Sequence, residues 1–222
     1  MKKLFFTVLA LAGLLCAAAQ TQDWANFGRF EQANGQVRNP KVVLMGNSIT
    51  ELWIKTHPDF FAARGYVSRG ISGQTTSQML VRFRADVVEL HPQVAVICGG
   101  TNDLAQNNGP IATQHIVENI ISMAELAMAA GIRPIICSVL PAGKYPWRTE
   151  IESVPEKIRD LNARLHRYAS DRGLIWVDYY TAMDAGDGSM RSEYTKDGVH
   201  PTPEGYDVME RIVLPALAHY CP

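Results

Sequence analysis

The sequence has no excess of charge: its 222 residues include 21 lysines and arginines against 22 aspartates and glutamates, a formal net charge of -1. A strongly basic balance would be the electrostatic sign of a protein that binds nucleic acid or an anionic membrane surface. The composition therefore favours a small or neutral partner, with no nucleic acid and no stable membrane anchor. There is also no linker rich in proline, glycine or serine and no internal repeat, so a single domain is expected over residues 20–222.

Cysteines are few, and phosphate-binding motifs are missing. The cysteines are Cys16, Cys98, Cys137 and Cys221, and no metal-ligand spacing occurs among them. Cys98 and Cys137 each end an apolar run, which favours buried strand residues, although a disulfide between neighbouring strands is also open. Neither G-x-G-x-x-G nor G-x-x-x-x-G-K-[ST] is present, which argues against a nucleotide-binding protein.

The first 19 residues have the pattern of a secretory signal peptide. Lys2 and Lys3 precede an apolar run from Leu4 to Leu15, and Ala17 with Ala19 forms an A-x-A cleavage pattern. The run is too short to span a bilayer as a stable helix, and a buried N-terminal helix is the weaker alternative. Lipid attachment at Cys16 is less expected, because a lipoprotein site has a small residue where Leu15 stands. The signal predicts a periplasmic or secreted protein.

Short runs rich in valine and isoleucine alternate with longer segments of helical period. This pattern is typical of a parallel sheet covered by helices on both faces, and it predicts a three-layer α/β/α sandwich with a flavodoxin-like, five-stranded parallel sheet. The predicted strands are Lys41 to Met45, Tyr66 to Arg69, Val94 to Cys98, Pro134 to Val139 and Leu174 to Val177. The predicted helices are Thr76 to Leu90, Ile111 to Ala130, Val154 to Asp171 and Pro203 to Ala218.

Helix boundaries carry their own signals. Gly131 and Gly173 are expected to end helices, and Thr202 with Pro203 marks the start of the last one. The last helix therefore begins just after His200.

Four polar segments follow predicted strands or precede the last helix. They are GNSIT at 46–50, RGISG at 69–73, GGTND at 99–103 and KDGVHPTPEGY at 196–206. Each alone could be an ordinary turn or helix cap. In open α/β sheets, however, ligands bind beyond the carboxyl ends of the strands. Asp197 and His200 are spaced so that the carboxylate can hold Nδ1 of the imidazole and leave Nε2 free as a base.

In order and spacing, these segments resemble the four blocks of the SGNH or GDSL-type hydrolases. The resemblance implies that Ser48 is the nucleophile, that His200 is the base and that Asp197 orients it. We expect this chemistry to need no metal and no organic cofactor, because the hydroxyl and the imidazole supply the nucleophile and the proton transfer. It also implies an oxyanion hole formed by the backbone N–H groups of Ser48 and Gly70 and by the Asn102 side chain. Asn47 stands where this family usually has aspartate. GISGQTTSQMLVRF at 70–83 and VLPAG at 139–143 are most similar to the branch of platelet-activating-factor acetylhydrolases.

The substrate is less well indicated by the residues. The segment 141–150 carries Tyr145, Trp147 and Arg148, which could contact substrate or only anchor the loop. Asn47, Trp147 and Arg148 are the candidate substrate-binding residues, whereas Trp53 is expected in the core. Asp103 and Asp178, at strand ends, are expected to serve as structural turn carboxylates.

The resemblance and the signal peptide together predict an esterase that removes short acyl groups, such as acetyl, from a glycan or another small ester. A lysophospholipase or thioesterase of the same superfamily is the alternative enzyme. A catalytically idle carbohydrate-binding module and a flavodoxin-like cofactor carrier are the alternatives outside the hydrolases.

Overall fold

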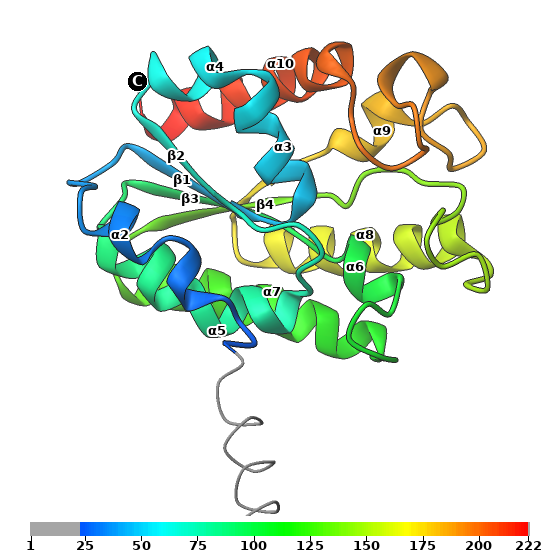
Figure 1. Ribbon diagram of the computed structural model, residues 1–222, viewed down its shortest axis with the longest axis horizontal. Helices are drawn as coiled ribbons and strands as arrows, with labels where there is room; N and C mark the ends of the chain where they lie inside the picture. Colours follow the sequence, from blue (N-terminus) through cyan, green and yellow to red (C-terminus); the bar gives the residue numbers. More distant parts are fainter. Residues whose placement is uncertain (1–22, 222) are drawn as a thin grey trace, which may run out of the picture.

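The computed structural model describes residues 23–221, and a five-stranded sheet runs through its centre (Figure 1). The strand order is β2-β1-β3-β4-β5, and every neighbouring pair is parallel. The strands are β1 (Val42–Gly46), β2 (Tyr66–Gly70), β3 (Val94–Cys98), β4 (Arg133–Cys137) and β5 (Ile175–Val177). The predicted five-stranded parallel sheet is confirmed.

Helices cover both faces of the sheet, which confirms the three-layer sandwich. On one face lie α3 (Ser48–Thr56), α4 (Pro58–Ala62), α9 (Tyr179–Met183) and α10 (Pro203–Tyr220) (Figure 1). On the other face lie α2 (Glu31–Asn34), α5 (Thr76–Asp86), α7 (Thr113–Ala129) and α8 (Val154–Asp171). The short elements are α6 (Thr101–Leu104) and the 3₁₀ turns η1 (Phe27–Arg29), η2 (Val88–Leu90) and η3 (Ser192–Tyr194). Within residues 23–221, no helix combines the length and apolar character needed to cross a membrane. The predicted signal peptide and Cys16 lie outside the described residues.

Successive strand residues serve the two faces in turn. Val43 and Met45 of β1 belong to the core under α5 and α7, whereas Val42 and Leu44 belong to the core under α3 and α10. All five residues of β1 and of β3 are buried. Side chains of a strand alternate between faces, so a strand buried on both sides needs a continuous apolar run. That run is the pattern from which the strands were predicted.

Most element ends differ from the predictions by one or two residues, and the capping signals were right. Gly131 and Gly173 both have positive φ, at 74° and 63°, as expected where a helix stops at a glycine. Thr202 accepts a hydrogen bond from the backbone N–H of Gly205 and caps α10, with Pro203 as its first residue.

Two of the predicted ends differ for identifiable reasons. The fourth strand ends at Cys137 rather than Val139, because the backbone of Val139 forms its hydrogen bonds with the Asn162 side chain. Asn162 Oδ1 accepts from the Val139 N–H (2.8 Å), and Asn162 Nδ2 donates to the Val139 carbonyl (2.9 Å). The helix predicted to reach Leu90 ends at Asp86, and the chain then tightens into η2. His91, with φ 52°, stands just before Pro92, and the residue preceding a proline disfavours helical conformation.

A fully buried arginine joins α5 to the carboxyl ends of two strands. Arg82 is 0% exposed, and its guanidinium forms an ion pair with Asp86 one turn later (2.8 Å). Its Nη2 donates to the backbone oxygens of Gly46 in β1 (3.1 Å) and Arg69 in β2 (2.9 Å), and its Nε donates to Gln74 Oε1 (2.6 Å). A buried charge persists only where it is paired and hydrogen-bonded. Arg82 therefore holds the edge of the sheet from which the loops after β1 and β2 leave.

Replacing Arg82 should destabilise the fold strongly. Arg82→Met leaves the Asp86 carboxylate buried without its cation, so the free energy of unfolding should fall by about 3–5 kcal/mol in urea denaturation at pH 7. Arg84→Met, on the exposed side of the same helix, is the control and should stay within about 0.5 kcal/mol of the unmodified protein. A loss below about 1 kcal/mol for Arg82→Met would contradict the role given to this residue.

Candidate active site

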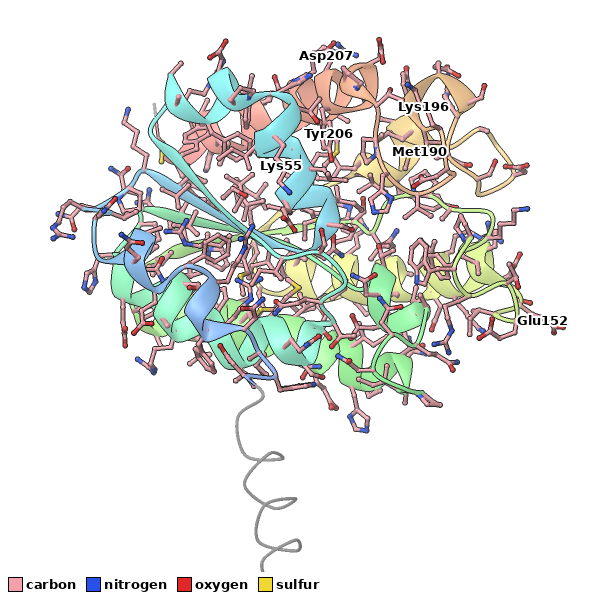
Figure 2. The ribbon with its side chains drawn as sticks, in the orientation of Figure 1. Lys55, Glu152, Met190, Lys196, Tyr206 and Asp207 are labelled. Carbon is pink, nitrogen blue, oxygen red and sulfur yellow. The ribbon has the colours of Figure 1, made fainter. Side chains whose placement is uncertain are left out.

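The polar segments picked out in the sequence meet at the carboxyl edge of the sheet. Ser48 is the first residue of α3, which begins directly after β1. Asn102 lies in α6, two residues beyond the Gly-Gly pair that follows β3. Asp197 and His200 lie in the loop before α10, whose Tyr206 hydroxyl donates to the backbone oxygen of Ile49 in α3 (2.8 Å). Figure 2 shows Tyr206 at this helix and Lys196 in the loop that leads to it.

Ser48, His200 and Asp197 form one hydrogen-bonded row. His200 Nε2 lies 2.9 Å from Ser48 Oγ, and His200 Nδ1 lies 2.6 Å from Asp197 Oδ2. Asp197 Oδ1 also accepts hydrogen bonds from the backbone N–H groups of His200 (2.8 Å) and Val199 (2.9 Å). With a proton on Nδ1 facing the carboxylate, Nε2 accepts the hydroxyl hydrogen of Ser48. The structure thus brings together a hydroxyl, a base and a carboxylate that orients the base.

The carboxylate of this row stays ionised over a wide pH range. Partial burial raises the pKa of Asp197, but hydrogen bonds from the His200 side chain and from the backbone of His200 and Val199 outweigh it and lower the pKa to about 2. Asp197 therefore keeps its negative charge beside the imidazole, where it stabilises a positive charge on His200.

Asn102 lines the cavity that contains Ser48 and His200, which measures about 410 Å³. Its Nδ2 donates to the backbone oxygen of Gln74 (2.9 Å), and its Oδ1 accepts from Asn107 Nδ2 (3.0 Å). A side-chain amide nitrogen carries two hydrogens, so one of them is left for a group bound in the cavity. The two fixed partners determine which way the amide faces.

The expected oxyanion glycine, Gly70, has a different place. Gly70 ends β2, and a Cβ added to it would come within 2.3 Å of the Glu51 backbone nitrogen in α3, so this glycine allows helix and strand to approach. The same cavity is lined instead by Gly73, three residues later in the same segment. Gly73 has φ 78°, with open space where a Cβ would stand. The structure extends β2 one residue beyond the predicted end at Arg69, so Gly70 belongs to the strand, whereas Gly73 lies in the turn beyond it.

Asn47, one of the three predicted substrate-binding residues, is buried, and its side chain already has a hydrogen-bond partner. It is 2% exposed, and its Oδ1 accepts the backbone N–H of Ile49 (3.1 Å) as the N-cap of α3. This placement argues against a substrate contact. Trp147 lines the cavity, and its ring lies 6.2 Å from that of His200 at an interplanar angle of 30°. Arg148 points elsewhere: it is paired with Glu150 (2.8 Å) and lines a neighbouring cavity.

Asn107, which the sequence reasoning missed, connects these groups. Its Nδ2 donates to Asn102 Oδ1 (3.0 Å) and to the Gly73 carbonyl (3.2 Å), and its Oδ1 accepts from Trp147 Nε1 (2.9 Å). One amide thus ties the Gly73 turn to Asn102 and positions the indole beside His200. Asn107 gives no pattern in the sequence, because all three partners are brought to it by the fold.

Glu51, also missed, fastens the turn from the other side. Its Oε2 accepts from the backbone N–H of Ser72 (2.7 Å) and from the Ser72 hydroxyl (2.6 Å), while its Oε1 faces Lys55 (2.7 Å). Burial raises the pKa of Glu51, but the hydrogen bonds from Lys55 and Ser72 outweigh it and lower the pKa to about 2. The carboxylate is therefore ionised at neutral pH and holds the residue that precedes Gly73.

The remaining candidates have the structural places expected of them. Asp178 caps α9 by accepting the backbone N–H of Thr181 (3.0 Å), and Trp53 is 2% exposed in the core. Asp103 is buried and accepts the Thr76 hydroxyl (2.6 Å) and backbone N–H. Burial raises the pKa of Asp103, against these hydrogen bonds, to about 6. Cys98 and Cys137 are both free and buried.

One group of possible metal ligands occurs within residues 23–221. His57, Asp207 and Glu210 bring their ligand atoms within 4.8 Å of one another, with Asp207 on α10 at the outer surface (Figure 2). None of the three lines the cavity around Ser48. His57 already shares a 2.7 Å hydrogen bond with Glu210.

A family model described as the GDSL-like Lipase/Acylhydrolase family matches residues 44–208. The chain belongs to this family. The matched range contains all four polar segments, and membership makes the protein an acylhydrolase of the carboxylic ester hydrolase class.

Known proteins of similar fold agree with this membership. The structure of a GDSL-like lipase from Bacteroides thetaiotaomicron VPI-5482 is 48% identical and has a TM-score of 0.87, covering 89% of this chain and 99% of that one. A Bos taurus protein named isoamyl acetate-hydrolyzing esterase 1 homolog is 27% identical over 203 residues, 80% of this chain and 81% of its own length. A Streptococcus pneumonia structure described as a platelet activating factor protein is 20% identical with a TM-score of 0.75, covering 95% of this chain and 99% of that one, which shows the fold alone.

Loss of the Glu51 carboxylate should slow this acylhydrolase. Glu51→Ala releases Ser72 and with it the turn that lines the cavity, so kcat for 4-nitrophenyl acetate should fall by about tenfold or more, with a smaller change in KM. Lys55→Ala removes a partner from the exposed side of the same carboxylate but leaves the Ser72 contacts, and it should stay within about twofold. Equal kcat values for the two variants would show that the turn is held by other contacts.

The buried Asp103 predicts a pH dependence of stability. Its pKa is about 6 in the folded protein against the ordinary 3.8, so the folded state binds the proton more tightly. As the pH falls from 7 to 4, the free energy of unfolding of the unmodified protein should therefore rise relative to that of Asp103→Asn, by roughly 2–3 kcal/mol. Chemical denaturation of both proteins across this range measures the difference, and a flat difference would refute the raised pKa.

Proposed function

We propose that this protein is a serine esterase that removes short acyl groups, such as acetyl, from a glycan or another small hydroxyl-bearing molecule. The observation that carries the proposal is the Ser48, His200 and Asp197 row beside a cavity that also presents Asn102 and Gly73. The predicted signal peptide would place the reaction in the periplasm or outside the cell.

In this mechanism, Ser48 Oγ attacks the ester carbonyl carbon while His200 Nε2 takes the hydroxyl proton. The tetrahedral intermediate collapses, the bond to the alcohol oxygen breaks, and His200 returns the proton to the departing alcohol. Water, deprotonated by His200, then attacks the acyl carbon, the bond to Ser48 Oγ breaks, and His200 returns the proton to Ser48 as the carboxylic acid leaves. Asp197 holds the imidazole throughout. These steps require only the side chains of this chain and water.

Three donors are available to the oxyanion. Ser48 is the first residue of α3, so its backbone N–H has no partner inside the helix. Gly73 and the Asn102 amide line the same cavity. We therefore assign the oxyanion hole to the N–H groups of Ser48 and Gly73 and to Asn102 Nδ2, with Gly73 in place of Gly70. One such donor is worth on the order of 3 kcal/mol of barrier.

The preference for a short acyl group rests on the cavity wall. Leu52 is the only aliphatic side chain among the residues that line the cavity around Ser48. A long acyl chain is buried against several hydrocarbon side chains, and this wall supplies only Leu52 and the Trp147 ring, which favours acetyl over the chains of a lysophospholipase or acyl thioesterase. The name of the Bos taurus relative, an acetate-hydrolysing esterase, points the same way.

Hydrolysis of 4-nitrophenyl acetate, butyrate and octanoate tests both parts of the proposal. Activity should be greatest on acetate and should fall by about a thousandfold or more in Ser48→Ala. Ser77→Ala, a serine on α5 outside the cavity, is the control and should keep full activity. A preference for octanoate would favour the lysophospholipase or thioesterase reading, and no serine-dependent activity on any ester would favour the idle binding module.

A further inference from the structure

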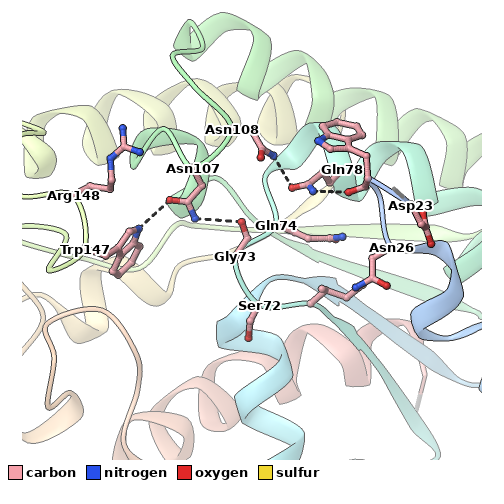
Figure 3. A pocket seen from close by; sticks show the side chains of 12 residues that line it. Asp23, Asn26, Ser72, Gly73, Gln74, Gln78, Asn107, Asn108, Trp147 and Arg148 are labelled. Atoms are coloured by element: carbon pink, nitrogen blue, oxygen red, sulfur yellow. Dashed lines mark hydrogen bonds between the residues drawn. The ribbon is translucent and has the colours of Figure 1, made fainter. Parts of the chain in front are cut away.

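A second cavity, of about 490 Å³, opens beside the one that contains Ser48. The two share Ser72, Gly73, Asn107 and Trp147 as common wall. Figure 3 shows this second cavity, with Trp147 and Asn107 along one side and Gln78 and Asn26 across from them. A molecule whose ester group lies at Ser48 can therefore extend past Trp147 into this space.

Side-chain amides dominate the wall of the second cavity, and a network of hydrogen bonds fixes two of them. Asn108 Nδ2 donates to Gln78 Oε1 (2.7 Å), and Gln78 Nε2 donates to the backbone oxygen of Trp24 (2.7 Å) (Figure 3). Within residues 23–221, Asn108 Oδ1 and the Asn26 amide have no hydrogen-bond partner. The wall thus offers a ligand one oriented acceptor, Asn108 Oδ1, and the unpaired amide of Asn26.

Two indole rings accompany these amides. Trp24 is 48% exposed and Trp147 is 41% exposed, and both line the second cavity. Both rings therefore present an apolar face to a molecule in this cavity. Flat apolar rings next to amides suit a ligand that has both C–H faces and hydroxyl groups.

The charge of the wall selects a neutral ligand. Asp23 and Arg148 are its only charged side chains, and they have opposite sign. Arg148 is already paired with Glu150 (2.8 Å), so no cluster of cations is present to bind a phosphate or another anionic group. Ile71 is the only aliphatic residue of this wall, which leaves little to hold an alkyl chain.

We propose that the second cavity binds sugar rings of an acylated neutral oligosaccharide, on the side of the departing alcohol. The assignment rests on the proposed esterase function. His200 returns the proton to the departing alcohol, and Trp147, whose ring lies 6.2 Å from that of His200, lines both cavities. The sugar that bears the acyl group lies beside Trp147, and the next ring reaches Trp24.

The kinetic test compares acetylated tetrasaccharides of xylose, glucose and mannose with 4-nitrophenyl acetate, which has no sugar. For at least one tetrasaccharide, Trp24→Ala should lower the ratio of kcat/KM values, sugar ester over 4-nitrophenyl acetate, by about tenfold, chiefly through KM. Trp24→Tyr keeps a flat ring and should restore most of the ratio. Phe27→Ala, an exposed aromatic residue of the same segment that does not line the cavity, should leave the ratio unchanged.

An unchanged ratio in Trp24→Ala for every tetrasaccharide would overturn the proposal. So would a protein that hydrolyses 4-nitrophenyl acetate and none of the sugar esters. Calorimetric titration of Ser48→Ala with the unacetylated tetrasaccharides separates this proposal from the proposed function. If the protein hydrolyses no ester but Ser48→Ala binds a tetrasaccharide and loses it on Trp24→Ala, the sugar site stands and the esterase proposal fails.

Discussion

The buried guanidinium of Arg82 is the constraint on which the active-site edge of the sheet depends. A buried charge persists only where it is paired and hydrogen-bonded, and Arg82 meets this requirement with an ion pair and with carbonyl oxygens at the carboxyl ends of β1 and β2. The Arg82 side chain reaches the ends of both β1 and β2, so the loops that follow these strands leave the sheet side by side. Ser48 stands at the start of the first loop's helix, and Gly73 lies in the second loop.

From Arg82, a series of hydrogen bonds between polar groups leads toward His200. Gln74 receives the Arg82 Nε–H on its side chain and the Asn102 amide on its backbone oxygen. Asn107 then links Asn102 to Trp147, whose ring lies against that of His200. Each member has a fixed partner on both sides, so the donors and the base are held before substrate binds. Such preorganisation lets a site stabilise developing charge without reorganising during the reaction.

The same chain of contacts separates two neighbouring cavities. Asn107 and Trp147 form a common wall, with the nucleophile on one side and the amide-rich cavity on the other. Around Ser48, Leu52 is the single aliphatic side chain of the wall, whereas the second cavity has the exposed Trp24 ring and hydrogen-bonding groups. Under the proposed function, we expect selectivity to depend more on the alcohol part of the ester than on its acyl part.

Local patterns in the sequence by themselves determined the alternating strands and helices, the helix stops and the pairing of Asp197 with His200, because each involves residues close along the chain. The ordered blocks also identified Ser48 and Asn102. Only the tertiary structure decided which glycine faces the cavity. Gly70 packs against the backbone of α3, whereas Gly73 has open space where a Cβ would stand. Glu51 and Ser72 meet because α3 packs against the loop after β2, and no spacing in the sequence encodes that contact.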